Sequence, residues 1–388
     1  MKRQRLHLHC RALAGILAPL LTLGFASGAF LTADFPEEDQ AAKPEPPRVR
    51  PIPPPEPRPP IIRPPRPIPH HDANAATRLI RQVSVGTPYR YQHHTIYPIN
   101  LAHGQAHSGL RTLDEALRNG WIDIEERDRA TVSKITIRNR SGHSIFLMAG
   151  EIIGGGKQNR VVQHDLILPP RSGVVTMPVY CIEQNRWGRS AGAFESKRNL
   201  AHPGLRKSAV ASESQDSIWR EVEERSRAAG VSARTKNYEA LYADRAVQSK
   251  LDGCLPHFHR FVGSRTVGAI AVVGYRIVGA DLFSDPRVFN RLWHKILRSY
   301  ALDYFSYPYP LASPHESHRR FKLVSPDVRG FLNNALAANY SRQHTPGSGT
   351  LYRISGRSDG ETIIWGGNAV HVGLFGNAPA VRPHIHRR

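Results

Sequence analysis

Cysteine is scarce in this chain of 388 residues, which contains only three. Cys10 lies in the N-terminal segment, so the rest of the chain cannot build the dense disulfide framework of small secreted domains. The other two, Cys181 and Cys254, are 73 positions apart. They could pair in an oxidising compartment, but free buried thiols are an equally good interpretation, because cysteine behaves as a small hydrophobe.

Acidic residues are also few: 32 Asp and Glu face 53 Lys and Arg, which gives a formal net charge of +21. Residues 70–388 alone carry 43 basic and 26 acidic side chains, so the body of the chain is itself basic. Such a surface favours anionic partners, for example lipid head groups, envelope polymers or acidic glycans. The aromatic residues are not interleaved with Lys and Arg in a recognisable binding motif, so we do not expect nucleic acid as the partner.

The N-terminus has the pattern of a secretory signal peptide. An uncharged run from Ala12 to Phe30 follows four basic residues, and small residues at 26–29 offer cleavage sites. The alternative is a retained anchor, because Ala12–Ala33 has 22 uncharged residues and a span needs about 20. Pro19 and the weakly apolar end of the run favour cleavage. We therefore predict residues 1–29 as a signal peptide, in a protein that is periplasmic or secreted, and membrane-anchored if the segment stays.

Residues 30–76 have the composition of a disordered linker. The part from 43 to 69 holds 14 of the 31 prolines, with five arginines spaced among them. Proline-rich chain cannot form a core and favours extended polyproline II, at about 3.1 Å per residue. We interpret it as a solvated spacer. A basic tether that contacts the membrane surface, or a stalk, is the functional alternative.

The body of the chain predicts both strands and helices. Thr112 is the expected N-cap of a short helix that Gly120 ends. Pro178 predicts an edge position or a bulge in its strand, because it cannot donate to a ladder. Alternating or apolar runs predict strands at Tyr91–Ile99, Val132–Arg138, Ser144–Met148, Arg160–Ile167, Val174–Ile182, Val267–Val273, Ile277–Phe283, Leu351–Ser355 and Glu361–Trp365.

Further helices are expected at 213–229, 286–304 and 326–340, from their apolar spacing. Runs of strands interrupted by helices, without a βαβ rhythm, predict an α+β fold with antiparallel-rich sheets and flanking helices. We place one domain at 77–310 and a C-terminal extension, with a helix, a hairpin and a disordered tail, at 311–388.

Two polar segments, each at the end of a predicted strand, are the candidate functional site. They run from Gly150 to Arg160 and from Tyr180 to Trp187, and the apolar span between them could fold one back onto the other. If the segments meet, one polar pocket is expected from Glu151, Gln158, Arg160, Glu183, Arg186 and Trp187.

The first segment could hold an anion. Consecutive glycines at Gly154, Gly155 and Gly156 let backbone N–H groups converge, while Lys157 and Arg160 add positive charge. The segment does not match a Walker A loop, because the first glycine and the final Ser or Thr are missing. A sharp bend that requires positive φ, with Lys157 in solvent, explains the glycines equally well.

Three catalytic or metal hypotheses remain. Glu151 and Glu183 could be the acid and base of a hydrolase, or two carboxylates neutralised by arginines in a structural network. A nucleophilic Cys181 lacks a local signature, and its apolar setting favours a buried strand residue. Cys254, His257 and His259 have no fourth ligand in sequence, so a zinc site there is a weak candidate and we expect neither metal nor cofactor.

Several ordered motifs resemble a known family. They are Leu-Asp-Glu-Ala-Leu at 113–117, Val-Ser-Lys-Ile-Thr-Ile-Arg-Asn at 132–139, the Gly150–Arg160 segment and Val-Gly-Ala-Ile-Ala-Val-Val-Gly at 267–274. With this order the chain resembles the bacterial ARPP domain family, named for association with rhodanese and phosphatase-superfamily proteins. The likeness covers roughly residues 85–308. No function is established for the family, so the resemblance implies none.

Together these features predict an exported envelope protein that binds an anionic envelope component or a small polar ligand. In this scheme Gly154–Gly156 and Lys157 hold the anion, and Arg160 and Arg186 pair with it. The alternatives are a hydrolase in which Glu151 or Glu183 is the general base, and a structural envelope protein without a chemical site.

Overall fold

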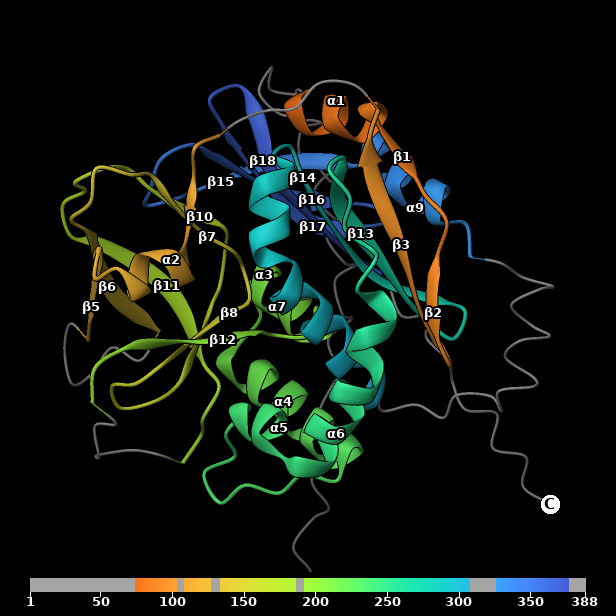
Figure 1. Cartoon of the computed structure of the whole chain (residues 1–388). Coiled ribbons are helices and arrows are strands. Elements are labelled where there is room, and N and C mark those ends of the chain that lie inside the picture. Colours follow the sequence, from red (N-terminus) through yellow and green to blue (C-terminus); the bar gives the residue numbers. More distant parts are fainter. Residues whose placement is uncertain (1–73, 103–107, 127–132, 186–191, 308–325, 377–388) are drawn as a thin grey trace, which may run out of the picture. The chain divides into compact units, whose positions relative to one another are not determined.

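The computed structural model describes residues 74–102, 108–126, 133–185, 192–307 and 326–376. Its largest sheet consists of Val83–Val85 (β1), Tyr89–Tyr91 (β2), His94–Leu101 (β3), Thr266–Val273 (β13), Arg276–Phe283 (β14), Asn339–Gln343 (β15), Thr350–Ser355 (β16), Asp359–Trp365 (β17) and Asn368–Phe375 (β18). The nine strands are ordered β1-β3-β13-β14-β18-β17-β16-β15, with β2 also paired to β3 (Figure 1). The strand pairs in this sheet are antiparallel.

Helices cover both faces of this sheet. The α-helices are Asn74–Gln82 (α1), Leu113–Arg118 (α2), Pro203–Val210 (α3), Gln215–Ala229 (α4), Glu239–Ala243 (α5), Arg245–Cys254 (α6), Pro286–Phe305 (α7) and Val328–Asn334 (α9). Leu255–Phe258 (η2) and Ala335–Ala337 (η3) are short 3-10 helices. Side chains alternate along β13: Ala269 and Ala271 share a core with α7, whereas Ile270 and Val272 share one with α1 and α9. Because both faces are covered, β13 is apolar almost throughout.

There are two smaller sheets, and strands of the six-stranded one carry the predicted polar segments. One contains Arg111–Thr112 (β4), Ile145–Leu147 (β7) and Leu166–Leu168 (β10). The other contains Ile122–Glu125 (β5), Lys134–Asn139 (β6), Glu151–Gly154 (β8), Arg160–Val162 (β9), Val175–Cys181 (β11) and Glu195–Leu200 (β12). Residues of these strands and of α2 form a separate apolar core that includes Leu113, Ile137 and Val179. The β4–β7 pair is parallel.

The predicted α+β class with antiparallel-rich sheets is confirmed, and local signals placed several elements well. Thr112 caps α2 in a capping box, because Glu115 N–H donates to its Oγ1 and the Glu115 carboxylate accepts from the Thr112 backbone N–H. Asp285 caps α7, and Pro286 occupies the first turn, where its missing N–H has no intrahelical partner to lose.

Two element predictions were wrong in detail. The strand expected at 160–167 is two strands in different sheets, because His164 and Asp165 are held by hydrogen bonds to Glu361 on β17. The helix expected at 326–340 ends at Asn334, and Tyr340 lies in β15. Pro178, for which an edge position or a bulge was predicted, lies where β11 changes partner: the strand pairs with β6 up to Pro178 and with β9 beyond it.

The segment predicted as a C-terminal extension contributes α9 and strands β15–β18 to the largest sheet, where β18 pairs with β14. The predicted signal peptide, almost all of the predicted linker and the tail after residue 376 lie outside the described residues. In the described part of the chain, none of the helices combines the length and apolar composition that crossing a bilayer requires.

Candidate functional site

The glycines between β8 and β9 form a tight bend. Gly155 has φ +114° and Gly156 φ +54°, conformations that side chains rarely adopt. A Cβ added to Gly155 would lie 2.5 Å from the carbonyl oxygen of Ala193. Lys157 donates its backbone N–H to the carboxylate of Glu126, at 3.0 Å. Backbone shape and close packing therefore account for these glycines.

Arg160, the arginine predicted to bind an anion at this bend, pairs with Glu126, which was not among the predicted site residues. Arg160 is 3 % exposed, and its Nη2 lies 2.5 Å from Oε1 of Glu126. Its Nη1 donates to the backbone carbonyl of Gln158 at 2.8 Å. The Gln158 amide is buried, and neither of its ends has a partner among the described residues.

Glu151 is part of a buried ion-pair network. Its carboxylate lies 2.5 Å from Nζ of Lys295 on α7 and accepts the backbone N–H of Met148 at 2.9 Å. Lys295 also contacts Asp114 at 2.7 Å. Burial raises the pKa of Glu151, and the neighbouring Lys295 offsets only part of this effect. With no exposed surface, this carboxylate joins α7 to β8.

Glu183 lies at the end of β11 and has different neighbours. One of its carboxylate oxygens accepts the backbone N–H of Asn159 at 3.2 Å, and its backbone forms an isolated bridge with Asn237. Among the described contacts none joins Glu183 to Glu151, whose partners are Lys295 and Met148. Arg186 and Trp187, the other predicted members of this pocket, lie outside the described residues.

Cys181 and Cys254 are buried thiols, and no disulfide is described between them. Burial raises the pKa of Cys181 to about 11, so its thiol is protonated at neutral pH. Cys254 lies 3.8 Å from Nδ1 of the buried His94, whereas His257 packs its ring on Tyr91, with the centroids 4.7 Å apart. The described residues contain no cluster of three or more His, Cys, Asp or Glu side chains that could hold a metal ion.

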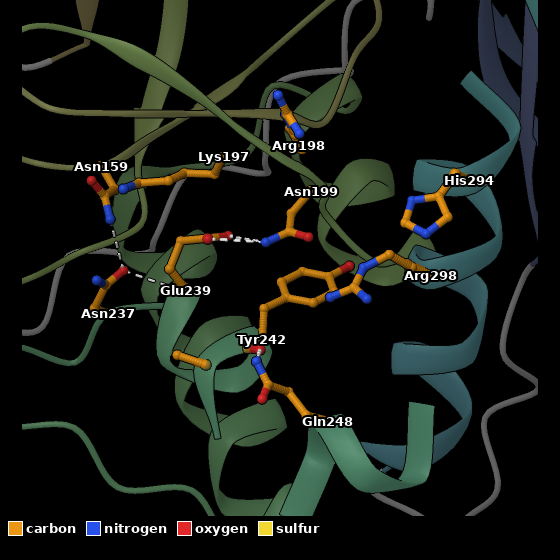
Figure 2. Close-up of a pocket in the computed structure, with 11 residues that line it drawn as sticks. Asn159, Lys197, Arg198, Asn199, Asn237, Glu239, Tyr242, Gln248, His294 and Arg298 are labelled. Atoms are coloured by element: carbon orange, nitrogen blue, oxygen red, sulfur yellow. Dashed lines mark hydrogen bonds between the residues drawn. The ribbon is translucent and has the colours of Figure 1, made fainter. Parts of the chain in front are cut away.

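A pocket of about 430 Å³ lies among β12, α5, α6 and α7, and we call it the Glu239 pocket (Figure 2). It is lined by Asn159, Lys197, Arg198, Asn199, Asn237, Glu239, Tyr242, Ala243, Gln248, His294 and Arg298. Its volume is in the range of small-molecule sites, roughly 300–1,000 Å³. Apart from Ala243 and the Tyr242 ring, every lining side chain is polar or charged.

Glu239 lies at the centre of this pocket. Figure 2 shows its carboxyl group between Asn199 and the Asn159–Asn237 pair. Asn199 Nδ2 lies 3.0 and 3.4 Å from the two carboxyl oxygens, and Asn237 Oδ1 accepts the Glu239 backbone N–H at 3.0 Å. Burial raises the pKa of Glu239 to about 7, although the hydrogen bond from Asn199 and the positive charges of Lys197 and Arg298 oppose the shift. The carboxyl group therefore changes its charge near neutral pH.

Cationic side chains surround this carboxyl. Lys197 and Arg198 come from β12, and Arg298 comes from α7, where its guanidinium lies 5.3 Å from the centre of the Tyr242 ring. Tyr242 is fixed in turn, because its hydroxyl donates to the Leu200 carbonyl at 2.7 Å. With three cationic side chains and one acid that titrates near neutrality, the pocket can attract and hold a small anion.

Asn159, which lies in the predicted segment Gly150–Arg160, lines this pocket. The other described residues that were predicted as site residues do not line it. A sequence signal did exist: His294 and Arg298 are one helical turn apart on a helix that was predicted correctly, so both had to share a face. No feature of the sequence indicated that this face of α7 would lie beside β12.

Comparison with known proteins gives a family. The family model of the ARG and Rhodanese-Phosphatase-superfamily-associated Protein domain matches residues 82–375. The match extends beyond the range of the resemblance seen in the sequence, and it includes β15–β18. No curated protein and no solved structure is significantly similar to the chain.

Proposed function

The chain belongs to the ARG and Rhodanese-Phosphatase-superfamily-associated Protein domain family, and we propose that this member is an exported envelope protein whose Glu239 pocket binds a small oxyanion. The family's name describes association with other proteins and specifies no ligand. The proposal therefore depends on the chemistry of the pocket.

The observation that carries the proposal is the set of side chains around one small cavity. Lys197, Arg198 and Arg298 supply positive charge, while amides and the Glu239 carboxyl supply directional hydrogen bonds. A carboxylate or phosphate group is the ligand chemistry that such a set recognises best, because hydrogen bonds between charged partners are the strong ones. The basic composition of the chain also favours an anion, by raising its local concentration.

Export is supported by the N-terminal pattern of basic residues, an uncharged run and small residues near position 28. An anionic envelope component is then the natural source of the ligand. The hydrolase alternative finds no support at Glu151, because that carboxylate is fully buried against Lys295.

Calorimetric titration of the protein with sulfate, glucuronate and neutral glucose at low ionic strength tests the binding proposal. We expect the two anions to bind and glucose not to bind. Arg298→Gln should weaken anion binding at least tenfold, because a hydrogen bond to a charged group contributes about 1.5–3 kcal/mol.

The matched control is Arg227→Gln, which removes the same charge from α4 at a side chain that is 73 % exposed. This variant should bind both anions like the unaltered protein. Equal weakening by the two substitutions would mean that general charge attracts the anion. If neither anion binds, the proposal is wrong and a structural role without a ligand is favoured.

A further inference from the structure

The described side chains donate few hydrogen bonds to the carboxyl group of Glu239, which is half-buried in the pocket. A carboxylate offers about four acceptor positions, and the donor that the described residues supply to the Glu239 carboxyl group is one amide, Asn199 Nδ2, at 3.0 and 3.4 Å from its two oxygens. Lys197 and Arg298 act on Glu239 through their charge, with no hydrogen bond described to its carboxyl oxygens. The group therefore has room to carry a proton and to become a donor.

Charged and titratable groups from two further elements face Glu239. From β12 come Lys197 and Arg198, and from α7 come Arg298 and His294. Burial and the nearby Arg298 lower the pKa of His294, so this ring is neutral at pH 7.

Two tyrosines on or beside α5 also face Glu239. Burial raises the pKa values of Tyr238 and Tyr242, so both are protonated at neutral pH. Asn159, Asn237 and Gln248 have no charge to change. Among the residues that line the pocket, Glu239 is therefore the acid that responds to pH near 7.

We propose that Glu239 takes up one proton when the pocket binds its oxyanion and that the neutral carboxylic acid donates a hydrogen bond to an oxygen of the ligand. This inference rests on the proposed function, because it concerns the same pocket and the same ligand class. The physical reason is charge: an ionised Glu239 would lie beside the bound anion and repel it. Protonation removes the repulsion and turns an acceptor into a donor. The proton comes from solvent, and no covalent bond forms with the ligand.

The inference also narrows the ligand. Lys197, Arg198 and Arg298 would attract any anion, but a carboxylic acid discriminates by hydrogen bonding. The ligand must place an acceptor oxygen of a carboxylate, sulfate or phosphate group against Glu239. A halide lacks such a directional acceptor and should bind more weakly than an oxyanion of the same charge.

The test is titration calorimetry of the full mature chain with sulfate and with glucuronate, neither of which titrates between pH 6 and 9. At pH 8 each titration is repeated in two buffers with different heats of ionisation, which gives the number of protons taken up. We expect uptake approaching one proton per ligand. Affinity should fall as pH rises from 7 to 9, by at most about tenfold per pH unit for a single linked proton.

Glu239→Gln is the discriminating variant, because glutamine is neutral at every pH and keeps a donor. It should abolish proton uptake, make affinity independent of pH, and bind sulfate more tightly than the unaltered protein at pH 8.5. The control Glu224→Gln removes an equal charge from an exposed position on α4 and should leave proton uptake unchanged.

Several outcomes would overturn the inference. Binding without proton uptake, with the same affinity from pH 6 to 9, would show that Glu239 keeps one charge state while the proposed function stands. Weaker binding by Glu239→Gln at every pH would show that Glu239 acts as an ionised acceptor. Absence of binding by the unaltered protein is a different result, which contradicts the proposed function itself. The comparison of two buffers needs no variant, so it tests proton uptake on binding even if Glu239→Gln does not fold.

Discussion

At the scale of single residues, this protein keeps charged groups in its interior by pairing them across long sequence distances. His371 on β18 lies between two carboxylates, with Nδ1 2.6 Å from Asp165 and Nε2 3.0 Å from Asp281. Asp281 also accepts from both terminal nitrogens of Arg206, at 2.9 and 2.6 Å, and from the Tyr300 hydroxyl. Because both nitrogens of His371 face acceptors, the ring is doubly protonated.

This arrangement predicts a pH dependence of stability. Burial alone would lower the pKa of His371, but Asp165 and Asp281 outweigh it and raise the pKa to about 9. A raised pKa in the folded state adds stability that is complete below the unfolded value, near 6.5, and is lost as pH rises through 9. In urea unfolding, the unaltered protein should therefore lose stability between pH 7 and 10.

The His371→Gln variant is the comparison. It should be less stable at pH 7, and the difference in unfolding free energy from the unaltered protein should narrow as pH approaches 10. A difference that stays constant from pH 6 to 10 would mean that His371 is not charged in the folded protein.

Two buried charges, Glu151 and Arg160, show which part of the site could be predicted from the sequence. Glu151 and Arg160 were recognised as charged groups at the ends of buried strands, where a partner is required. Their partners are Lys295, 144 positions away, and Glu126, 34 positions away. The sequence shows that each buried charge needs a counter-charge, but tertiary packing decides which residue supplies it. Helix α7 supplies Lys295 to Glu151, and Glu126, directly after β5, pairs with Arg160.

At the scale of elements, local signals were reliable where the chain itself carries the stabilising contact. The Thr112–Glu115 capping box and the Asp285–Pro286 start of α7 lie within four residues of the helices they begin. The β13–β14 hairpin turns at Gly274, which adopts φ +63°, directly after the predicted strand Val267–Val273. Where tertiary contacts decide, as at His164 between β9 and β10, the sequence pattern predicted one strand instead of two.

The bend between β8 and β9 gives a prediction at this scale. Gly155→Ala combines an unfavourable φ of +114° with a Cβ that would lie 2.5 Å from the Ala193 carbonyl oxygen. We expect a loss of roughly 2–4 kcal/mol in unfolding free energy, since a strained backbone alone costs about 1–3 kcal/mol. Chemical denaturation of the Gly155→Ala variant and of the unaltered protein measures this loss of unfolding free energy.

Gly120→Ala is the matched control, because φ is +64° there and nothing lies within 4 Å of the added Cβ. It should lose only about 1–2 kcal/mol, the cost of the left-handed conformation itself. If the two variants are equally destabilised, crowding against Ala193 contributes nothing.

At the scale of the whole molecule, the chain brings distant segments together in ways that no local pattern records. Strands β15–β18, which come from the segment predicted as a C-terminal extension, join the largest sheet through the β14–β18 pair. The Glu239 pocket likewise combines the β8–β9 bend, β12, α5, α6 and α7. Composition predicted an anionic partner, but the place where it would bind depends on this assembly.

Processing of the N-terminus is a prediction for the whole chain. Expressed in a Gram-negative host, the protein should be recovered from the periplasmic fraction with Ala29 or Phe30 as its first residue, since small residues precede both positions. N-terminal sequencing and intact mass measure this. An uncleaved chain in the membrane fraction would favour the anchor, and recovery in the cytoplasm would contradict export.

The central claim, that the Glu239 pocket holds an oxyanion, is tested most directly by anomalous diffraction from crystals soaked in selenate. We predict a selenium peak inside the pocket, within hydrogen-bonding distance of Lys197 or Arg298, and its loss in the Arg298→Gln variant. Selenium peaks confined to other surfaces, with the pocket empty or filled by protein side chains, would contradict the claim.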